Sequence, residues 1–229
     1  LLSARARERV LHGLPRQSFD LEHDVLAAFR LLQKGQNIGK VVVRVAGVSS
    51  VPPRGVHAIS GGSGALGQVF GRWLAGGGAH CVVLASRSGV APQHEIAGCD
   101  LYVQRCDCSH WVDVRLLQAC MSHGCAQPLS GTWHAAGVLA DVMTLMLTDQ
   151  TLRFVYGPKA HGAWLLQQSC ASAPLGAFVL FSSTAALLGN QGQANYSAAN
   201  CCLDALALRR AATGSLAASV QFGPWADAG

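Results

Sequence analysis

Two hydroxyl side chains stand at a spacing in this sequence that suits the reduction of a carbonyl group. Tyr196 lies 13 residues after Ser183, and Asn200 follows Tyr196 by four residues, which is one turn along the same face of a helix. A serine hydroxyl, a tyrosine phenol and an asparagine amide can therefore converge on one carbonyl oxygen. A tyrosine and an asparagine one turn apart also form many ordinary polar helix edges, so the chemistry depends on what surrounds them.

The composition predicts one domain with a large core, with room for a piece of a second domain. The chain has 229 residues, of which 50% are hydrophobic. No apolar stretch approaches the roughly 18 residues that a membrane-spanning helix needs. The formal net charge of +5 comes from scattered lysines and arginines, which favours a mildly basic surface over nucleic-acid binding. A groove for phosphorylated ligands is also consistent with this charge.

Neither the cysteines nor the histidines form a metal-binding pattern. The nine cysteines are an odd number and contain no repeated C-x-x-C pair, so we expect reduced, mostly buried thiols. The nine histidines lack the H-E-x-x-H and H-x-H patterns. The charged segment from Ser3 to Arg9 is not followed by an apolar one, so we expect no signal peptide. A cytoplasmic location is therefore expected. We expect no metal, no membrane and no nucleic-acid partner.

Residues 1–46 are too few to form a domain of their own. Apolar residues recur at helical spacing over Leu21–Lys34, and Gly35 stands where that helix would end. A short strand is expected over Ile38–Val45.

A linker over residues 47–54, with two prolines and no apolar periodicity, leads into a longer region, residues 55–229. In that region short apolar runs alternate with helical patterns. The expected strands are near Val56–Ser60, Cys81–Ala85, Leu101–Arg105, Gly131–Ala135, Ala177–Phe181 and Ala217–Gln221. The expected helices are near Leu66–Ala75, Trp111–Ser122, Asp149–Gln168 and Asn195–Ala212. This alternation predicts an α/β fold with a doubly wound parallel sheet.

The first expected strand of the longer region leads into a glycine-rich loop that opens a helix. The loop residues are Gly61, Gly62, Ser63, Gly64, Ala65, Leu66 and Gly67. Glycines at such a turn let the backbone approach a pyrophosphate, whose charge is met by free N–H groups and by the positive end of the helix dipole. A glycine cluster can instead be a flexible turn, but the strand before it and the helix after it favour a Rossmann-type nucleotide site.

Residues that follow the next two strands indicate which nucleotide is bound. Dinucleotides without a 2′-phosphate are usually held there by a carboxylate, whereas this chain has Ser86, Arg87 and Ser88. The planar guanidinium of Arg87 can hold a phosphate, which favours NADPH over NADH; the alternative is a solvated turn arginine. Asp107, after the third strand, can accept a hydrogen bond from the adenine amino group or can cap the next helix.

Together these motifs resemble one family, the ketoreductase domains of type I polyketide synthases, which belong to the short-chain dehydrogenase/reductase superfamily. The likeness covers about Gly55 to Gly229. Its matching segments, in order, are Gly61 to Gly67, Ser86 to Gly89, His134 to Val138, Pro158-Lys159, Phe181 to Ser183, Gln193 to Tyr196 and Gly223 to Trp225. Most of the superfamily has a lysine four residues after the tyrosine. Here Asn200 stands there and Lys159 lies 24 residues before the serine, an exchange similar to that of polyketide and animal fatty acid synthase ketoreductases.

The resemblance implies NADPH-dependent reduction of a β-ketoacyl thioester to a β-hydroxyacyl thioester. In that reaction Tyr196 is the general acid, Ser183 donates a hydrogen bond to the carbonyl oxygen, and Lys159 supplies the cation beside the phenol and holds the nicotinamide ribose. Asn200 orders either the lysine or a water that relays protons. Taken alone, Lys159 also fits a surface lysine and Ser183 a capping hydroxyl. The family motif adds three residues at the cofactor, which are Ala135, Ala136 and Gly137.

The resemblance also bears on the configuration of the product. Family members that give the D-hydroxy product typically carry Leu-Asp-Asp after the His-Ala-Ala-Gly segment, and this chain has Leu139-Ala140-Asp141. The second, more diagnostic aspartate is therefore present as Asp141. Leu188 stands eight residues before Tyr196, where the opposite class carries a tryptophan. We expect a D-hydroxyacyl product, although the first aspartate is missing and Gln191 stands where a proline is common.

Both ends of the sequence resemble parts of a larger synthase. Leu14-Pro15, Phe19, Leu26 to Arg30 and Ile38 to Val42 are similar, in order, to the C-terminal tail of an enoylreductase domain. Family members continue beyond Gly229 into a lid helix and a last strand, so we expect the fold to be truncated before these elements. The implied partners are an acyl carrier protein, with the β-ketoacyl chain on its phosphopantetheine arm, and the adjacent enoylreductase and other synthase domains.

Two alternatives fit the same motifs. One is the ketoreductase of an animal-type fatty acid synthase, which shares the catalytic residues. The other is a catalytically silent ketoreductase-like domain that serves as a scaffold. Such silent domains usually lose the tyrosine, the lysine or the glycine loop, and all three are present here.

Overall fold

The computed structural model describes residues 15–20, 24–35, 37–44, 54–92, 96–125 and 127–223. They fall into two units, Leu1–Ser50 and Val51–Gly229, and each is described here by itself. The elements of the first unit are strand β1 (Arg16–Asp20), helix α2 (Val25–Gln33) and strand β2 (Lys40–Arg44), and the two strands pair in parallel.

The first unit agrees with the sequence in its helix and its second strand. The expected helix over 21–34 begins at Val25, and residues 21–23 lie outside the described residues. It ends before Gly35, whose φ of +61° suits glycine at a helix C-terminus. The strand β1 was not expected, because Arg-Gln-Ser-Phe-Asp carries too little apolar character to signal a strand. Most of the expected linker, residues 47–53, lies outside the described residues.

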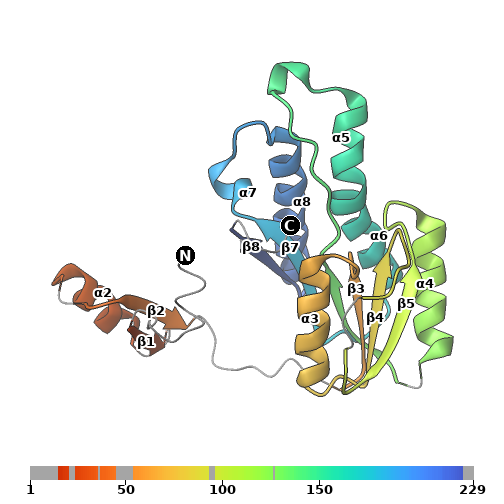
Figure 1. The fold of residues 1–229 in the computed structure, drawn as a ribbon, viewed down its shortest axis with the longest axis horizontal. Coiled ribbons are helices and arrows are strands. Elements are labelled where there is room, and N and C mark those ends of the chain that lie inside the picture. The colour runs from red at the N-terminus through yellow and green to blue at the C-terminus, as the bar shows by residue number, and fades with distance from the viewer. Residues whose placement is uncertain are drawn as a thin grey trace, which may run out of the picture. The chain divides into compact units, whose positions relative to one another are not determined.

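Parallel strands form the sheet of the second unit, in the order β5-β4-β3-β6-β7-β8 (Figure 1). Their bounds are Val56–Ser60 for β3, Cys81–Ser86 for β4, Asp100–Arg105 for β5, Leu129–His134 for β6, Ala177–Ser183 for β7 and Ala218–Phe222 for β8. This order is that of a doubly wound Rossmann sheet and confirms the predicted fold class. β3 and β6 are neighbours at the point where the strand order changes direction, and ligands of such sheets bind beyond the carboxyl ends of the strands there.

Most helices of the second unit lie where the sequence predicts them. Their bounds are Ala65–Gly76 for α3, Trp111–Gly124 for α4, Asp149–Tyr156 for α5, Gly162–Ser169 for α6, Ala185–Leu188 for α7 and Ala194–Ala212 for α8. The prediction of one helix over 149–168 was wrong in one respect, because a π-helical turn, Gly157–His161, separates α5 from α6. Pro158 has no N–H to give to the regular ladder at this point. α7 and the 3-10 turn Thr144–Met146 were not expected.

The core lies on both faces of the sheet. On one face, residues of β3 and β4 pack with Val114 and Leu117 of α4 and with Leu166 of α6. On the other face, β3 and β4 pack against α3, which stands in front of the sheet in Figure 1. The central strand β3 is buried along its whole length, as expected for a parallel strand that helices cover on both sides. No helix in the described part of the chain is long and apolar enough to cross a membrane.

Candidate active site

Two cavities open beyond the carboxyl ends of the central strands. We call the first the glycine-loop cavity. It has a volume of about 560 Å³ and is lined by Gly61, Ser63, Gly64, Ser86, Arg87, Ser88, Cys106, Asp107, Cys108, Ala135, Ala136, Gly137, Val138 and Pro158. The second, the tyrosine cavity, has a volume of about 720 Å³, and Lys159, Ser183 and Tyr196 are among its lining residues. Ala135, Gly137 and Val138 line both, so the two cavities adjoin along one segment after β6.

The glycine loop is packed too closely to accept side chains. Gly61 has a φ of +73°, and a Cβ there would lie 2.7 Å from the main-chain nitrogen of Ala136. A Cβ on Gly67 would lie 2.5 Å from the carbonyl oxygen of Gly61. Gly62 likewise presses against Leu84 of β4, since a Cβ would lie 2.7 Å from the Leu84 Cβ. The loop therefore folds back on the start of α3 and leaves the cavity wall to the backbone.

Not every residue of the predicted loop reaches the glycine-loop cavity. Gly61, Ser63 and Gly64 line it, whereas Gly62, Ala65 and Gly67 line neither of the two cavities. Leu66 lines the tyrosine cavity instead. α3 begins at Ala65 with Gly64 as its N-cap, so the unpaired N–H groups and the positive dipole end of a 12-residue helix lie at this cavity.

The predicted cofactor residues at and after the ends of β4 and β5 line the glycine-loop cavity. Ser86, the last residue of β4, accepts a hydrogen bond on Oγ from the Gly89 N–H at 3.2 Å, which closes the turn that carries the exposed Arg87. Asp107 is not the N-cap of α4, because that position is His110. Its carboxylate accepts hydrogen bonds from the N–H and the hydroxyl of Ser109, at 2.9 and 2.6 Å. Asp107 is thus held at the cavity by its own turn.

The charge state of Asp107 follows from these contacts. Partial burial alone would raise the pKa of its carboxyl, but the hydrogen bonds from Ser109 and the positive charge of Arg87 lower it, and the net shift is downward. The carboxylate is therefore ionised at neutral pH and can only accept hydrogen bonds.

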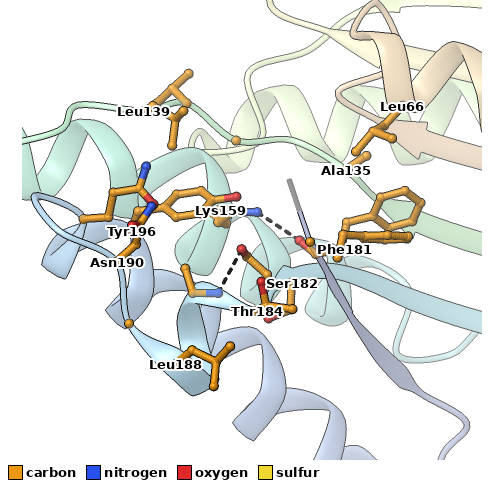
Figure 2. A pocket seen from close by; sticks show the side chains of 18 residues that line it. Leu66, Ala135, Leu139, Lys159, Phe181, Ser182, Thr184, Leu188, Asn190 and Tyr196 are labelled. Carbon is orange, nitrogen blue, oxygen red and sulfur yellow. Dashed lines mark hydrogen bonds between the residues drawn. The ribbon is translucent and has the colours of Figure 1, made fainter. Parts of the chain in front are cut away.

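Lys159 is the most deeply buried of the predicted catalytic residues that line a cavity. It lies in the π-helical turn with 3% of its surface exposed. Its ammonium donates a hydrogen bond to the carbonyl oxygen of Phe181 at 2.9 Å and lies 5.3 Å from the centre of the Tyr196 ring (Figure 2). Gly137 makes room for it, because a Cβ there would lie 3.3 Å from the Lys159 nitrogen. Burial lowers the pKa of Lys159 to about 8, against an opposing effect of the Asp204 carboxylate.

The two hydroxyl groups come from different elements and meet at the same cavity. Ser183 is the last residue of β7, and its Oγ accepts a hydrogen bond from the Ala185 N–H at 3.1 Å. This bond uses a lone pair and leaves the hydroxyl proton of Ser183 to be donated elsewhere. Tyr196 lies in the first turn of α8. The structure therefore brings Ser183, Tyr196 and Lys159 together at the tyrosine cavity.

Asn200 lies behind these residues and does not line either cavity. Its side chain is fully buried and its Nδ2 donates a hydrogen bond to the Tyr196 carbonyl oxygen at 2.9 Å. The Asn200 Oδ1 is buried and has no hydrogen-bond partner among the described residues. Such an orphaned acceptor needs a donor, since leaving it dry is costly.

Asp141 reaches the tyrosine cavity through another residue. It is exposed and does not line the cavity itself, but both its carboxylate oxygens accept from the Gln193 Nε2, at 3.2 and 3.1 Å. Gln193 lines the cavity, as do Leu139 and Leu188. Of the positions that the sequence linked to product configuration, Leu139 and Leu188 therefore line the cavity and Asp141 contacts a lining residue.

Sequence reasoning gave no role to His134. This residue is fully buried at the end of β6, where its Nδ1 lies 2.6 Å from the Ser60 Oγ and its Nε2 lies 2.8 Å from the Lys159 carbonyl oxygen. Burial and the charge of Lys159 lower its pKa to about 4. Its place in the His-Ala-Ala-Gly segment was the only signal in the sequence, and it does not show the contact with Lys159.

Comparison with known proteins places this chain in a family. The KR domain family model matches residues 55–227. A phenolphthiocerol/phthiocerol polyketide synthase of Mycobacterium tuberculosis is 37% identical over 241 residues, which cover 96% of this chain and 11% of that protein. Pikromycin polyketide synthase component PikAII of Streptomyces venezuelae is 37% identical over 230 residues, which cover 95% of this chain and 6% of that protein. The chain thus spans a small fraction of the curated relatives it matches.

Solved structures give the same result. The first ketoreductase of the tylosin polyketide synthase superposes with a TM-score of 0.71 at 40% identity, over 80% of this chain and 42% of that one. An A1-type ketoreductase superposes with a TM-score of 0.73 at 35% identity, over 81% of this chain and 41% of that one.

The chain therefore belongs to the ketoreductase domain family of type I polyketide synthases. The family and the fold define the class of protein: an oxidoreductase that acts on a β-keto group with a nicotinamide cofactor.

Proposed function

We propose that this domain reduces the β-keto group of a carrier-bound β-ketoacyl thioester to a β-hydroxyacyl thioester with NADPH. The observation that carries this proposal is the meeting of Tyr196, Ser183 and Lys159 at one cavity, which shares a wall with the glycine-loop cavity. A cofactor in the one and a substrate in the other would then touch along the segment after β6.

The glycine-loop cavity fits a phosphorylated dinucleotide. A Cβ on Gly61 or Gly67 would displace the loop that forms part of its wall, and the N-terminus of α3 would face a bound phosphate there. Arg87, at the end of β4, offers a guanidinium to a 2′-phosphate, which supports NADPH. Asp107, ionised, is an acceptor for the adenine amino group. When bound, NADPH supplies the hydride that reduces the carbonyl carbon.

Tyr196 would deliver the proton to the carbonyl oxygen as negative charge develops on that oxygen. A free phenol is a weak acid with a pKa near 10, so the phenolate that it leaves after proton transfer needs stabilisation. The Lys159 ammonium, 5.3 Å from the ring centre, stabilises that phenolate. Because Lys159 is buried, solvent screens its charge less than it would at the surface.

Ser183 and Asn200 would each assist the tyrosine. Ser183 donates its hydroxyl proton to the carbonyl oxygen, since its lone pair already accepts from Ala185. Of the two roles open to Asn200, its geometry favours the ordering of a relay water. Its Oδ1 has no protein partner in the described residues, and the ammonium of Lys159 donates to Phe181 instead.

We further propose a D-hydroxyacyl product and an acyl carrier protein as the donor of the substrate. Asp141 supports the first point because it holds Gln193 on the wall of the tyrosine cavity. Some similar solved structures are designated A-type or A1-type ketoreductases. Chiral analysis of the product therefore tests the configuration proposed for this domain directly. Mainly L-alcohol would overturn the configuration that we propose.

Residues 1–46 are proposed to be the tail of an enoylreductase domain in the same synthase. The alignment with the mycobacterial relative covers 96% of this chain, so the likeness extends beyond the matched ketoreductase residues 55–227. An enoylreductase directly before this domain in the gene would support the assignment, and an unrelated domain there would overturn it.

The proposed function is tested by NADPH oxidation with a β-ketoacyl thioester surrogate. We expect turnover by the protein and a loss on the order of 10²–10⁴-fold in kcat for Tyr196→Phe, which removes the general acid. Tyr156→Phe is the matched control, because the Tyr156 hydroxyl contacts Cys202 and lines neither cavity. NADPH binding without turnover in the unmodified protein would indicate a silent scaffold domain instead.

A further inference from the structure

His134 connects the central strands of the sheet to the main chain of Lys159. It is the last residue of β6 and is fully buried. One ring nitrogen meets the hydroxyl of Ser60, the last residue of β3, at 2.6 Å. The other meets the carbonyl oxygen of Lys159 at 2.8 Å. The imidazole thus bridges the two strands at the switch point of the sheet and the turn that carries the catalytic lysine.

The partners of His134 decide which nitrogen carries the proton. The carbonyl oxygen of Lys159 can only accept a hydrogen bond, so the Nε2 of His134 must be the donor. The Nδ1 is then a lone-pair acceptor for the Ser60 hydroxyl. A neutral ring in this tautomer satisfies both contacts, and burial together with the nearby Lys159 charge keeps the pKa of His134 low enough for the ring to stay neutral.

Lys159 needs such an anchor because its backbone is irregular. It lies in a π-helical turn, Gly157–His161, that interrupts the helical path between α5 and α6. Such turns are rare and are found mostly at functional sites. The ammonium has a hydrogen bond to the Phe181 carbonyl at 2.9 Å and a ring contact with Tyr196 at 5.3 Å. Figure 2 shows the Lys159 side chain between these two residues. A small shift of the main chain would change both contacts.

The packing around the turn supports the same connection. Gly162, the first residue of α6, lets this helix approach β6 closely, because a Cβ there would lie 3.4 Å from the His134 Cε1. Cys108 lies close to the same position, with its Cβ 3.0 Å away. At most a methyl group would fit between the start of α6 and the imidazole, so the helix packs close to the ring.

We infer that His134 is a positioning residue, which holds the Lys159 carbonyl through its Nε2–H and so keeps the lysine ammonium against Phe181 and Tyr196. The inference rests on the proposed role of Lys159 in catalysis. His134 itself lines neither cavity and therefore acts on the reaction only through the lysine.

The position of the lysine can be measured without cofactor or substrate. Lys159 is the single lysine of residues 55–229, and the others are Lys34 and Lys40. An NMR titration of ¹³C-lysine-labelled protein therefore contains only three lysine signals, and the titration of Lys159 can be followed among them. The groups that face its ammonium are Tyr196 and Asp204 of α8, and His134 stays neutral beneath its main chain.

We compare two variants of the imidazole. His134→Phe keeps a flat ring but removes the donor, and we expect the Lys159 signal to titrate at higher pH, back toward the behaviour of an exposed lysine. His134→Gln offers an amide N–H in place of Nε2–H, and we expect the titration to return toward that of the unmodified protein. Ser60→Ala, which removes only the partner of Nδ1, should give a smaller change in the same direction. Ser60→Ala also provides the test of the inference if His134→Phe does not fold.

The control is His57→Phe, which replaces another fully buried histidine, one that accepts a hydrogen bond from Trp133 rather than contacting Lys159. It should leave the Lys159 titration unchanged even if it lowers stability. An unchanged Lys159 titration in folded His134→Phe or Ser60→Ala would overturn the inference. Because the titration needs no turnover, this failure is distinct from failure of the proposed reaction.

Kinetics then separate positioning from a structural role. In His134→Phe we expect kcat to fall on the order of tenfold or more, because the charge beside Tyr196 is misplaced. The basic limb of the kcat profile should move with the Lys159 titration, and His134→Gln should restore it. A fall in kcat that neither shifts with pH nor recovers in His134→Gln would also contradict the inference.

Discussion

The two adjoining cavities are built in different ways. The glycine-loop cavity depends on a close-packed backbone, since Gly61 and Gly67 have no space for a Cβ, and its cation, Arg87, is exposed. The tyrosine cavity takes its properties from side chains, and its cation, Lys159, is 3% exposed. A rigid cradle suits a cofactor that is the same in every cycle, whereas the chemistry of the keto group depends on individual functional groups.

This difference predicts two kinds of mutational effect. Substitutions of the loop glycines should act by displacing the backbone and should weaken cofactor binding. Substitutions of the reactive side chains in the tyrosine cavity should act through lost groups and should lower kcat with little loss of stability.

Lys159→Met should lower kcat by roughly 10²–10³-fold, because it removes the cation beside Tyr196 while nearly keeping the volume of the side chain. Stability should be preserved or improved, since a buried charge is replaced by an apolar group. Steady-state kinetics and thermal unfolding measure the two effects. A large loss of stability would show that Lys159 holds the fold rather than the chemistry.

Gly67→Ala should weaken NADPH binding by about 10- to 100-fold. The added methyl group would introduce strain of about 1–3 kcal/mol, and the loop would have to move away from its binding position to relieve that strain. Its Cβ would lie 2.5 Å from the Gly61 carbonyl oxygen. Fluorescence titration with NADPH measures the effect.

The matched control is Gly76→Ala at the other end of α3, where a Cβ would meet nothing within 4 Å. It should leave binding unchanged and should raise stability slightly, because alanine is the better helix former. Equal effects of the two substitutions would contradict a backbone-built cavity.

Arg87→Gln should raise the KM for NADPH about tenfold and leave the KM for NADH nearly unchanged, because only NADPH carries the 2′-phosphate that a guanidinium can hold. Kinetics with both cofactors measure the ratio. Arg72→Gln, on the exposed side of α3 and outside both cavities, is the control. An equal rise in KM for both cofactors would show that Arg87 does not bind the 2′-phosphate.

The kcat of the unmodified protein should fall as the pH rises above about 8, the value to which burial lowers the pKa of Lys159. The charged form is the active one in the proposed mechanism, and it is lost as the pH passes upward through the pKa. Between one unit below and one unit above the pKa, the charged fraction falls about tenfold. A kcat that rises over this interval would exclude the protonated lysine as the active form.

Gln193→Ala should change the ratio of D to L product and raise the KM for the thioester by a few-fold, with a smaller effect on kcat. It removes the hydrogen bonds that link the cavity wall to Asp141 and leaves general acid–base groups intact. Chiral chromatography of the product measures the ratio. Gln168→Ala, exposed on α6 and outside the lining of both cavities, is the control and should keep the ratio of the unmodified protein.

The sequence was most informative where structure follows from local pattern. The strand over 56–60 was predicted at its observed bounds, since a short apolar run before a glycine loop admits few alternatives. The doubly wound parallel sheet was predicted from the alternation of strands and helices, whereas the order of its strands came from the structure. The single helix expected over 149–168 was wrong because apolar periodicity does not register a π-helical turn.

Other features were decided by tertiary structure alone. Asp107 could be a helix cap or a cavity residue from its position in the sequence, and the fold placed the cap at His110 instead. The link between Asp141 and Gln193 joins residues 52 positions apart, so no local pattern contains it. The burial of Lys159, and with it the lowered pKa, depends on β7 and α8 closing over the turn.

The sequence by itself therefore determined the class of fold and the glycine-rich loop and named the candidate reactive side chains, because these depend on residue type, short-range spacing and the family motif. Only the tertiary structure decided how the lysine is buried, which carbonyl holds it and that His134 lies beneath it. These properties arise from contacts between β3, β6, β7 and the π-helical turn, which are far apart in the chain and meet only when the sheet has formed.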